Sequence, residues 1–97
     1  MRIISRAKLQ EFWELHRDST EHLKAWYQIA KKAEWNTPQD VKDQYRNASI
    51  LQDGRVVFNI KGNHYRLVVW INYDFFTIYI RFIGTHKEYD KIDVQKI

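Results

Sequence analysis

The amino-acid sequence predicts an α+β domain in which N-terminal helices pack on one face of an antiparallel sheet and a short helix follows the last strand. Two patterns along the chain indicate this order. In the first half, apolar residues recur every three or four positions, which is typical of one face of a helix. In the second half they alternate with polar residues, which is typical of strands. Three of these strands are joined only by short turns, so we expect a β-meander.

Three helices are expected before the meander, after a short strand at residues 3–4. Ser5 is expected to cap the first helix. Its apolar face consists of Leu9, Phe12, Trp13 and His16. Asp18, with Glu21 three residues later, indicates the start of a second helix. Its apolar face consists of Leu23, Trp26, Tyr27 and Ala30. Thr37 is expected to cap a third helix with Pro38 at its first position, ending near residue 47.

The strands of the meander are expected over residues 55–61, 65–73 and 75–83. The turn signals around them are Asp53–Gly54, Gly62–Asn63 and Asp74. A glycine–asparagine pair between two alternating runs is typical of a hairpin. In the first of these strands one face carries Val56, Phe58 and Ile60, and the other carries Val57, Asn59 and Lys61.

Arg81 interrupts the apolar last strand. Alternation places it on one face with Thr77 and Tyr79, and the opposite face then carries Phe76, Ile78, Ile80 and Phe82. Arg66 begins the preceding strand and shares a face with Val68 and Trp70. Two arginines near one sheet surface would offer two guanidinium forks to phosphate oxygens, although each is equally compatible with an ordinary surface position. Trp70 and Tyr79 either stack on exposed nucleic-acid bases or belong to the core.

A Gly84–Thr85 turn is expected after the last strand. Thr85 and Glu88 then form a capping box, so a helical turn should begin at His86. His86, Tyr89 and Asp90 would lie on one face of that turn and bring together an acid/base group, a phenol and a carboxylate. The alternative is a solvated C-terminal helix that packs Tyr89 on the sheet.

Length and composition limit the possible functions. Ninety-seven residues with 44% hydrophobic and 15% aromatic content make one globular domain, residues 1–97. The net charge of +4 is concentrated in the C-terminal half, which favours a polyanionic partner, although such a charge is also ordinary for a soluble protein. There is no cysteine, no apolar run of membrane-spanning length and no signal peptide, so we expect a cytoplasmic protein. His64 and His86 lack further ligands at metal-binding spacing, so neither a metal site nor another cofactor is expected.

Two blocks of this sequence together resemble one protein family. They are Val57-Phe58-Asn59-Ile60-Lys61-Gly62-Asn63-His64-Tyr65-Arg66-Leu67 and Ile80-Arg81-Phe82-Ile83-Gly84-Thr85-His86-Lys87-Glu88-Tyr89-Asp90. Both are similar to the HigB toxins of bacterial type II toxin–antitoxin systems, within the RelE-like superfamily of mRNA interferases. The resemblance implies a RelE-like fold that cuts messenger RNA, commonly on the translating ribosome. It also implies a neutralising antitoxin, usually a helix-turn-helix protein of the HigA type.

The resemblance also implies which residues act. The basic and acid/base positions map onto Arg66, Arg81, His86, Lys87 and Tyr89. Further RNA contacts are expected from Arg55, Lys61, Asn63, His64 and Asp90. In a metal-independent reaction the RNA 2′-hydroxyl is the nucleophile, His86 the leading acid or base and Arg81 the leading transition-state clamp. Two alternatives remain open from the sequence: a non-catalytic RNA- or ribosome-binding module, and a protein-interaction domain.

Overall fold

The computed structural model describes residues 1–97 and confirms the predicted order of helices before the meander. Its main elements are β1 (Arg2–Ile4), α1 (Arg6–Leu15), α2 (Thr20–Lys32), α3 (Pro38–Gln44), β2 (Ser49–Ile50), β3 (Arg55–Ile60), β4 (Tyr65–Asn72), β5 (Thr77–Thr85) and α4 (His86–Asp90). Short 3₁₀ turns occupy Arg17–Ser19 and Gln52–Gly54. None of the helices has the length and apolar character needed to cross a membrane.

The five strands form one sheet in the order β1-β5-β4-β3-β2. β3, β4 and β5 make the predicted antiparallel meander. The first strand differs from the expectation of a purely antiparallel sheet, because β1 pairs with β5 in parallel, with Arg2 opposite Thr77. Parallel neighbours need a long connection, and the helices and strands between β1 and β5 supply it. The two-residue strand β2, which the sequence does not predict, forms the other edge.

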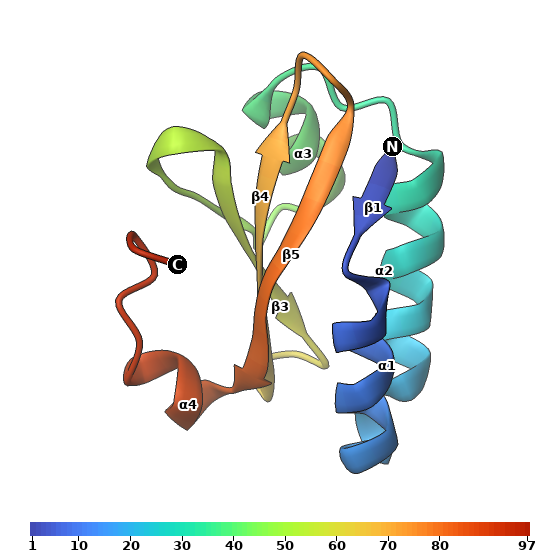
Figure 1. Ribbon diagram of the computed structural model, residues 1–97, viewed down its shortest axis with the longest axis vertical. Coiled ribbons are helices and arrows are strands. Elements are labelled where there is room, and N and C mark those ends of the chain that lie inside the picture. Colours follow the sequence, from blue (N-terminus) through green and yellow to red (C-terminus); the bar gives the residue numbers. More distant parts are fainter.

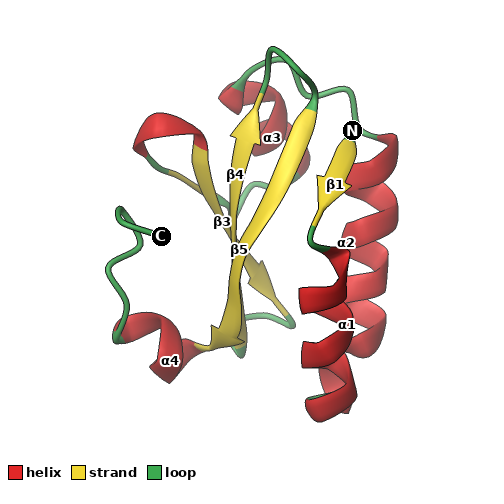
Figure 2. Ribbon diagram, viewed as in Figure 1, coloured by secondary structure: helices red, strands yellow, loops and turns green.

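The helices α1 and α2 lie along one side of the sheet, whereas α4 and the C-terminal segment lie on the other (Figures 1 and 2). The core fills the space between the sheet and α1–α3. Its helical members include Leu9, Phe12, Leu23, Trp26 and Val41, and its sheet members include Val56, Phe58, Leu67, Val69, Ile78 and Ile80. Each fully buried side chain of this size stabilises the fold by about 1.5–3 kcal/mol. The face of β3 that meets the helices is the one that carries Val56, Phe58 and Ile60.

Two of the three predicted helix starts need correction. Thr37 caps α3 as predicted: its hydroxyl accepts from the Asp40 amide at 3.3 Å, and the Asp40 carboxylate accepts from the Thr37 amide at 3.2 Å. Ser5 occupies the cap position of α1 but makes no capping hydrogen bond, because its φ of 73° is left-handed. Asp18 does not start a helix. Its carboxylate instead binds the β3–β4 hairpin, and α2 begins at Thr20.

Both ends of β5 differ from the prediction. Phe75 and Phe76 belong to the β4–β5 turn, where they are 77% and 45% exposed, because Phe76 has a left-handed φ of 49°. The strand then continues through Gly84 and Thr85, which were expected to form a turn. Gly84 pairs with Arg66 of β4, so the strand leads directly into α4.

A β-bulge interrupts the pairing of β4 with β5. Val68 lies opposite Phe82 and Val69 lies opposite Ile80, which leaves Arg81 as the extra, unpaired residue. An extra residue reverses the alternation of every position beyond it. The prediction that Phe82 shares the face of Ile78 and Ile80 is therefore wrong.

Candidate functional site

One face of the sheet is free of α1, α2 and α3, and we call it the open face. It consists of Arg55, Val57 and Asn59 of β3, Arg66, Val68 and Trp70 of β4, and Thr77, Tyr79, Arg81, Phe82 and Gly84 of β5. As predicted, Arg66 shares a face with Trp70, and Arg81 shares a face with Tyr79. Arg66 and Arg81 form no salt bridge, so the open face carries positive charge that no carboxylate neutralises.

The short helix α4 lies beside the end of β4 that carries Arg66. Its predicted capping box is confirmed: the Thr85 hydroxyl accepts from the Glu88 amide at 3.2 Å, and Glu88 accepts from the Thr85 amide at 2.8 Å. These bonds with Thr85 lower the pKa of the Glu88 carboxyl. The Arg66 guanidinium lies 5.9 Å from the centre of the Tyr89 ring, and its Nη1 donates to the Asn63 carbonyl at 3.1 Å.

His86 is the first residue of α4, and its side chain contacts Asp90. Nδ1 of His86 lies 2.9 Å from Oδ2 of Asp90, with both side chains about half exposed. When the Nδ1 proton is donated to this carboxylate, Nε2 carries the lone pair and can accept a proton. The backbone amide of His86 also donates to the His64 carbonyl at 3.2 Å, which ties α4 to the β3–β4 turn.

A second group lies further along the open face. The Trp70 and Tyr79 rings are opposite each other on β4 and β5, with centres 5.2 Å apart and planes inclined by 37°. The Arg81 guanidinium lies 5.9 Å from the centre of the Trp70 ring and 5.7 Å from that of Tyr79. Both rings are half-buried and lie outside the core between sheet and helices. The alternative that they are core residues is thereby excluded.

The remaining predicted residues are dispersed. Arg55 lies opposite Trp70, and its Nε donates to the main-chain oxygen of Ile97 at 2.9 Å. Lys87 is exposed on α4 and makes no salt bridge. Asn63 and His64 are exposed in the β3–β4 turn, where the His64 Nδ1 lies 2.9 Å from the Lys61 carbonyl.

Lys61 is directed away from the other predicted RNA contacts. Its ammonium lies 2.7 Å from the Asp18 carboxylate, which also accepts a 2.6 Å hydrogen bond from the Tyr65 hydroxyl. The hydrogen bond from Lys61, and after it the one from Tyr65, lowers the pKa of Asp18 to about 2. The same hydrogen bond to Asp18 raises the pKa of the Tyr65 phenol. This cluster connects the α1–α2 junction to the hairpin, and no local pattern around Asp18 indicates it.

Two residues that support the site were not among the predicted ones. A Cβ on Gly84 would lie 2.5 Å from Phe82 Cζ and 3.1 Å from Glu88 Oε1, so a larger residue there would displace the Phe82 ring and crowd the cap of α4. The glycine itself was visible in the sequence as a turn signal. The position of Phe82 depends on the bulge and has no local signal.

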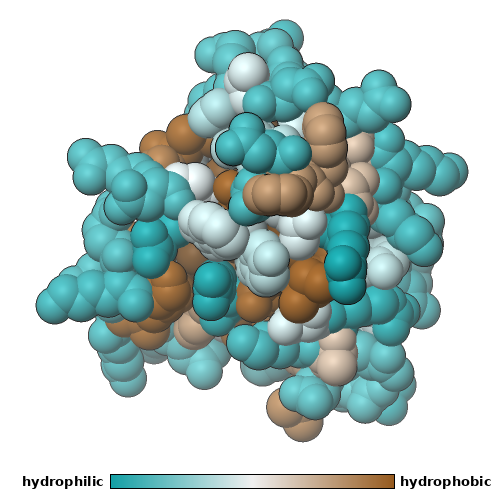
Figure 3. Space-filling model, turned by 45° about the horizontal axis from the view of Figure 1, so that its top comes forward, coloured by the Kyte–Doolittle hydropathy of each residue, from teal (hydrophilic) through white to brown (hydrophobic).

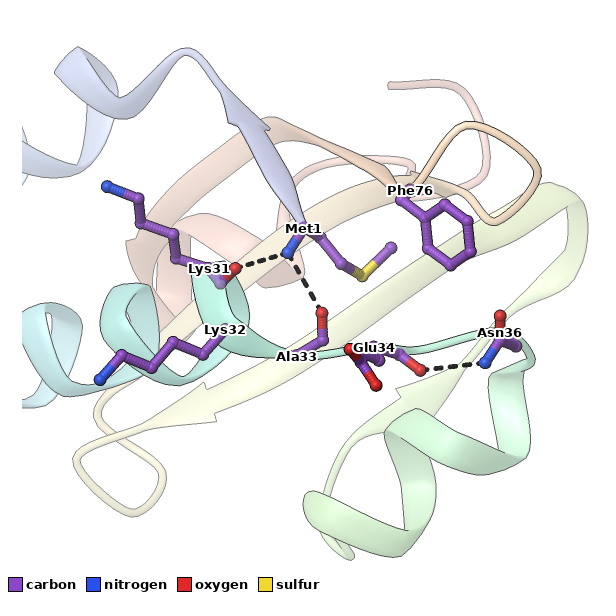
Figure 4. Close-up of a pocket in the computed structure, with 7 residues that line it drawn as sticks. All are labelled: Met1, Lys31, Lys32, Ala33, Glu34, Asn36 and Phe76. Carbon is purple, nitrogen blue, oxygen red and sulfur yellow. Dashed lines mark hydrogen bonds between the residues drawn. The ribbon is translucent and has the colours of Figure 1, made fainter.

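A hollow of about 500 Å³ lies away from these groups, at the end of α2 (Figure 4). It is lined by Met1, Lys31, Lys32, Ala33, Glu34, Asn36 and Phe76. The Met1 amino group donates to the Lys31 carbonyl at 2.6 Å and to the Ala33 carbonyl at 3.1 Å. Figure 3 shows this end of the molecule as apolar patches within a mainly hydrophilic surface. No three histidine, aspartate or glutamate side chains lie close enough to hold a metal ion anywhere in the protein.

Comparison with known proteins identifies the class to which this fold and site belong. The family model of the HigB toxins, described as the RelE-like toxic component of a toxin–antitoxin system, matches residues 19–92. The chain therefore belongs to the HigB toxin family, in agreement with the resemblance noted in the sequence. A relative from Escherichia coli O6:H1 strain CFT073, named mRNA interferase HigB, is 26% identical over 94 residues. That match covers 95% of this chain and 91% of the relative.

Proposed function

We propose that this toxin inhibits translation as an endoribonuclease that cleaves messenger RNA, without a metal ion, on translating ribosomes in the cytoplasm. Family membership and the name of the Escherichia coli relative support the substrate class. The observation that carries the proposal is the grouping at α4 of the His86–Asp90 pair with Tyr89, which contacts Arg66. An imidazole can accept a proton, a phenol can donate one, and a guanidinium can offset charge on the phosphate, which are the three roles in phosphodiester cleavage by an internal nucleophile.

In the proposed reaction the 2′-hydroxyl of the RNA is the nucleophile. Nε2 of His86 accepts its proton while Asp90 holds Nδ1–H. The 2′ oxygen bonds to phosphorus, the bond from phosphorus to the 5′ oxygen breaks, and Tyr89 donates a proton to that leaving oxygen. The negative charge on the phosphate oxygens is offset by Arg66, Arg81 and Lys87. The products are a 2′,3′-cyclic phosphate end and a 5′-hydroxyl end.

Other groups extend the proposed RNA contact. Arg55 lies on the open face beside Trp70, and Asn63 and His64 lie in the turn next to α4. Lys61 contributes least to the proposed contact because Asp18 holds its ammonium. The proposed protein partner is a helix-turn-helix antitoxin of the HigA type that neutralises this activity.

The test is to incubate the purified protein with free messenger RNA and with translating ribosomes in EDTA, and to map the new ends. We expect cleavage that persists in EDTA. His86→Ala and Arg81→Ala should each reduce it by about 10²–10⁴-fold and abolish growth arrest while circular dichroism remains unchanged. Full toxicity of both variants would refute the assigned roles. Binding to RNA or ribosomes without cleavage would instead identify a binding module, a function that the arginines and rings of the open face also suit.

A further inference from the structure

The rings of Trp70 and Tyr79 form a compact pair that the chemistry proposed at α4 does not explain. Arg66 and Trp70 are four residues apart on β4, which is about 13 Å at ~3.3 Å per residue. The aromatic group is therefore separate from the contact between Arg66 and Tyr89. We propose that Trp70 and Tyr79 form a stacking platform for one nucleobase of single-stranded RNA, close to the phosphate whose charge Arg81 offsets. This inference rests on the proposed function, since it extends the site for the same substrate.

The position of the rings supports a binding role. Nε1 of Trp70 donates to the Asp53 carbonyl at 2.5 Å, which fixes the orientation of the indole. Gly54, beside that carbonyl, has a φ of 83°, and a Cβ there would lie 3.0 Å from Trp70 Nε1. The turn is thus shaped to approach the indole closely. Rings that are already held in place lose little conformational entropy when a base stacks on them.

The position of Arg81 points to an anionic ligand. Its side chain is exposed, lies over both rings and has no carboxylate partner. It is also the extra residue of the bulge, and bulges commonly redirect one side chain at a binding site. Aromatic rings that stack on bases, combined with a cation for the backbone, are the usual means of binding single-stranded nucleic acid.

The spacing of the two groups limits where the stacked base lies. A stacked strand carries one phosphate per ~3.4 Å, so about 13 Å corresponds to at most about four nucleotides. The base on the platform therefore lies within about four nucleotides of the phosphate that is cleaved at α4. A base stacked there would affect binding without contacting the reacting atoms.

Tryptophan fluorescence can test the platform directly. The protein has four tryptophans, and Trp13, Trp26 and Trp35 are only 2–7% exposed. Trp70 is half-buried and is the one that a base can reach. We would titrate the protein with a single-stranded oligonucleotide of 2′-deoxy sugars, which lacks the nucleophile and cannot be cleaved. The expected result is quenching that disappears in Trp70→Phe.

Two further variants keep the test independent of folding and of catalysis. Tyr79→Leu should weaken binding by roughly 5- to 100-fold, the range of base–aromatic stacking, with the thermal unfolding midpoint measured alongside. His86→Gln should retain full quenching while losing cleavage. An abasic site moved along the oligonucleotide should weaken binding most at a single position within about four nucleotides of the cleavage site.

The outcomes separate this inference from the proposed function. The stacking platform would be refuted if the wild-type protein cleaves RNA but its fluorescence does not change on binding. It would also be refuted if folded Tyr79→Leu binds the oligonucleotide as tightly as the wild type. Either result would leave the proposed nuclease activity unaffected. Quenching that depends on Trp70, without any cleavage, would support the platform and refute the nuclease.

Discussion

Gly84→Ala provides a sharp test of whether the position of α4 controls activity. Gly84 pairs with Arg66 on β4 and immediately precedes Thr85, the capping residue of α4. The added methyl would lie 2.5 Å from Phe82 Cζ and 3.1 Å from Glu88 Oε1. Carbon atoms in comfortable contact are ~3.5–4.0 Å apart, so the Phe82 ring must withdraw by about 1 Å, and the Glu88 carboxylate that caps α4 must also shift slightly.

The magnitude follows from these two contacts. Overpacking of this kind costs about 1–3 kcal/mol, and weakening a helix cap costs about 1 kcal/mol. We therefore expect a loss of about 2 kcal/mol, which lowers Tm by roughly 10 °C in a domain of this size. The effect on RNA cleavage should be larger, because a ~1 Å displacement of catalytic groups costs on the order of 10²-fold in rate.

The assay is single-turnover cleavage at a temperature well below both Tm values, with Ala30→Gly as the control. Ala30 is fully buried on α2, on the other side of the sheet from α4. Its replacement costs about 1 kcal/mol in helix propensity and about 0.8 kcal/mol in lost methyl burial, a similar total. The reasoning is refuted if Gly84→Ala cleaves at the wild-type rate, or if the two variants lose cleavage equally.

Two further predictions concern the charged pairs. In Asp90→Asn, single-turnover cleavage should fall by only about two- to fivefold. The His86–Asp90 pair is half exposed, and such a pair contributes at most ~1 kcal/mol. A loss above 100-fold would contradict this prediction. In the folded protein the pKa of Asp18 is about 2, below the ordinary value of 3.8. The ionised carboxylate therefore stabilises the fold above about pH 4, and this stabilisation is lost as the pH falls toward 2. Urea unfolding of wild type and Asp18→Asn should therefore show a difference that shrinks between pH 4 and pH 2, and a difference independent of pH would rule this out.

Features that depend on neighbouring residues were predictable from the sequence. The Thr37 cap with Pro38 after it, and the capping box of Thr85 with Glu88, involve residues close in the sequence, and both helices begin where the pattern indicates. The hairpin at Gly62 also follows from local chemistry, since its φ of 64° is one that glycine adopts without strain. Alternation likewise predicts that Val56, Phe58 and Ile60 share one face of β3 and that Arg66 and Trp70 share one face of β4, as the structure shows.

Features that depend on distant partners were not predictable. The parallel pairing of β1 joins Arg2 to Thr77, and nothing near either residue specifies it. Asp18 is a residue type that commonly starts helices, but its carboxylate accepts a hydrogen bond from Lys61, which lies 43 positions away in the sequence. In this case tertiary hydrogen bonds outweigh a local preference for capping that contributes about 1 kcal/mol.

The bulge at Arg81 explains why the open face and α4 are on the same side of the sheet. Without the extra residue, alternation from Ile80 would turn Phe82 and Gly84 toward α1 and α2. With it, both lie on the open face, where Gly84 faces Arg66 and the Phe82 ring lies near the Glu88 cap of α4. The chain therefore enters α4 with Tyr89 beside Arg66, and the inserted residue itself adds a guanidinium over Trp70 and Tyr79. Arg81 thus determines which side chains of β5 face α4, and it also supplies positive charge to that face. This double role explains how groups from two strands and a five-residue helix can be brought together in a chain of 97 residues.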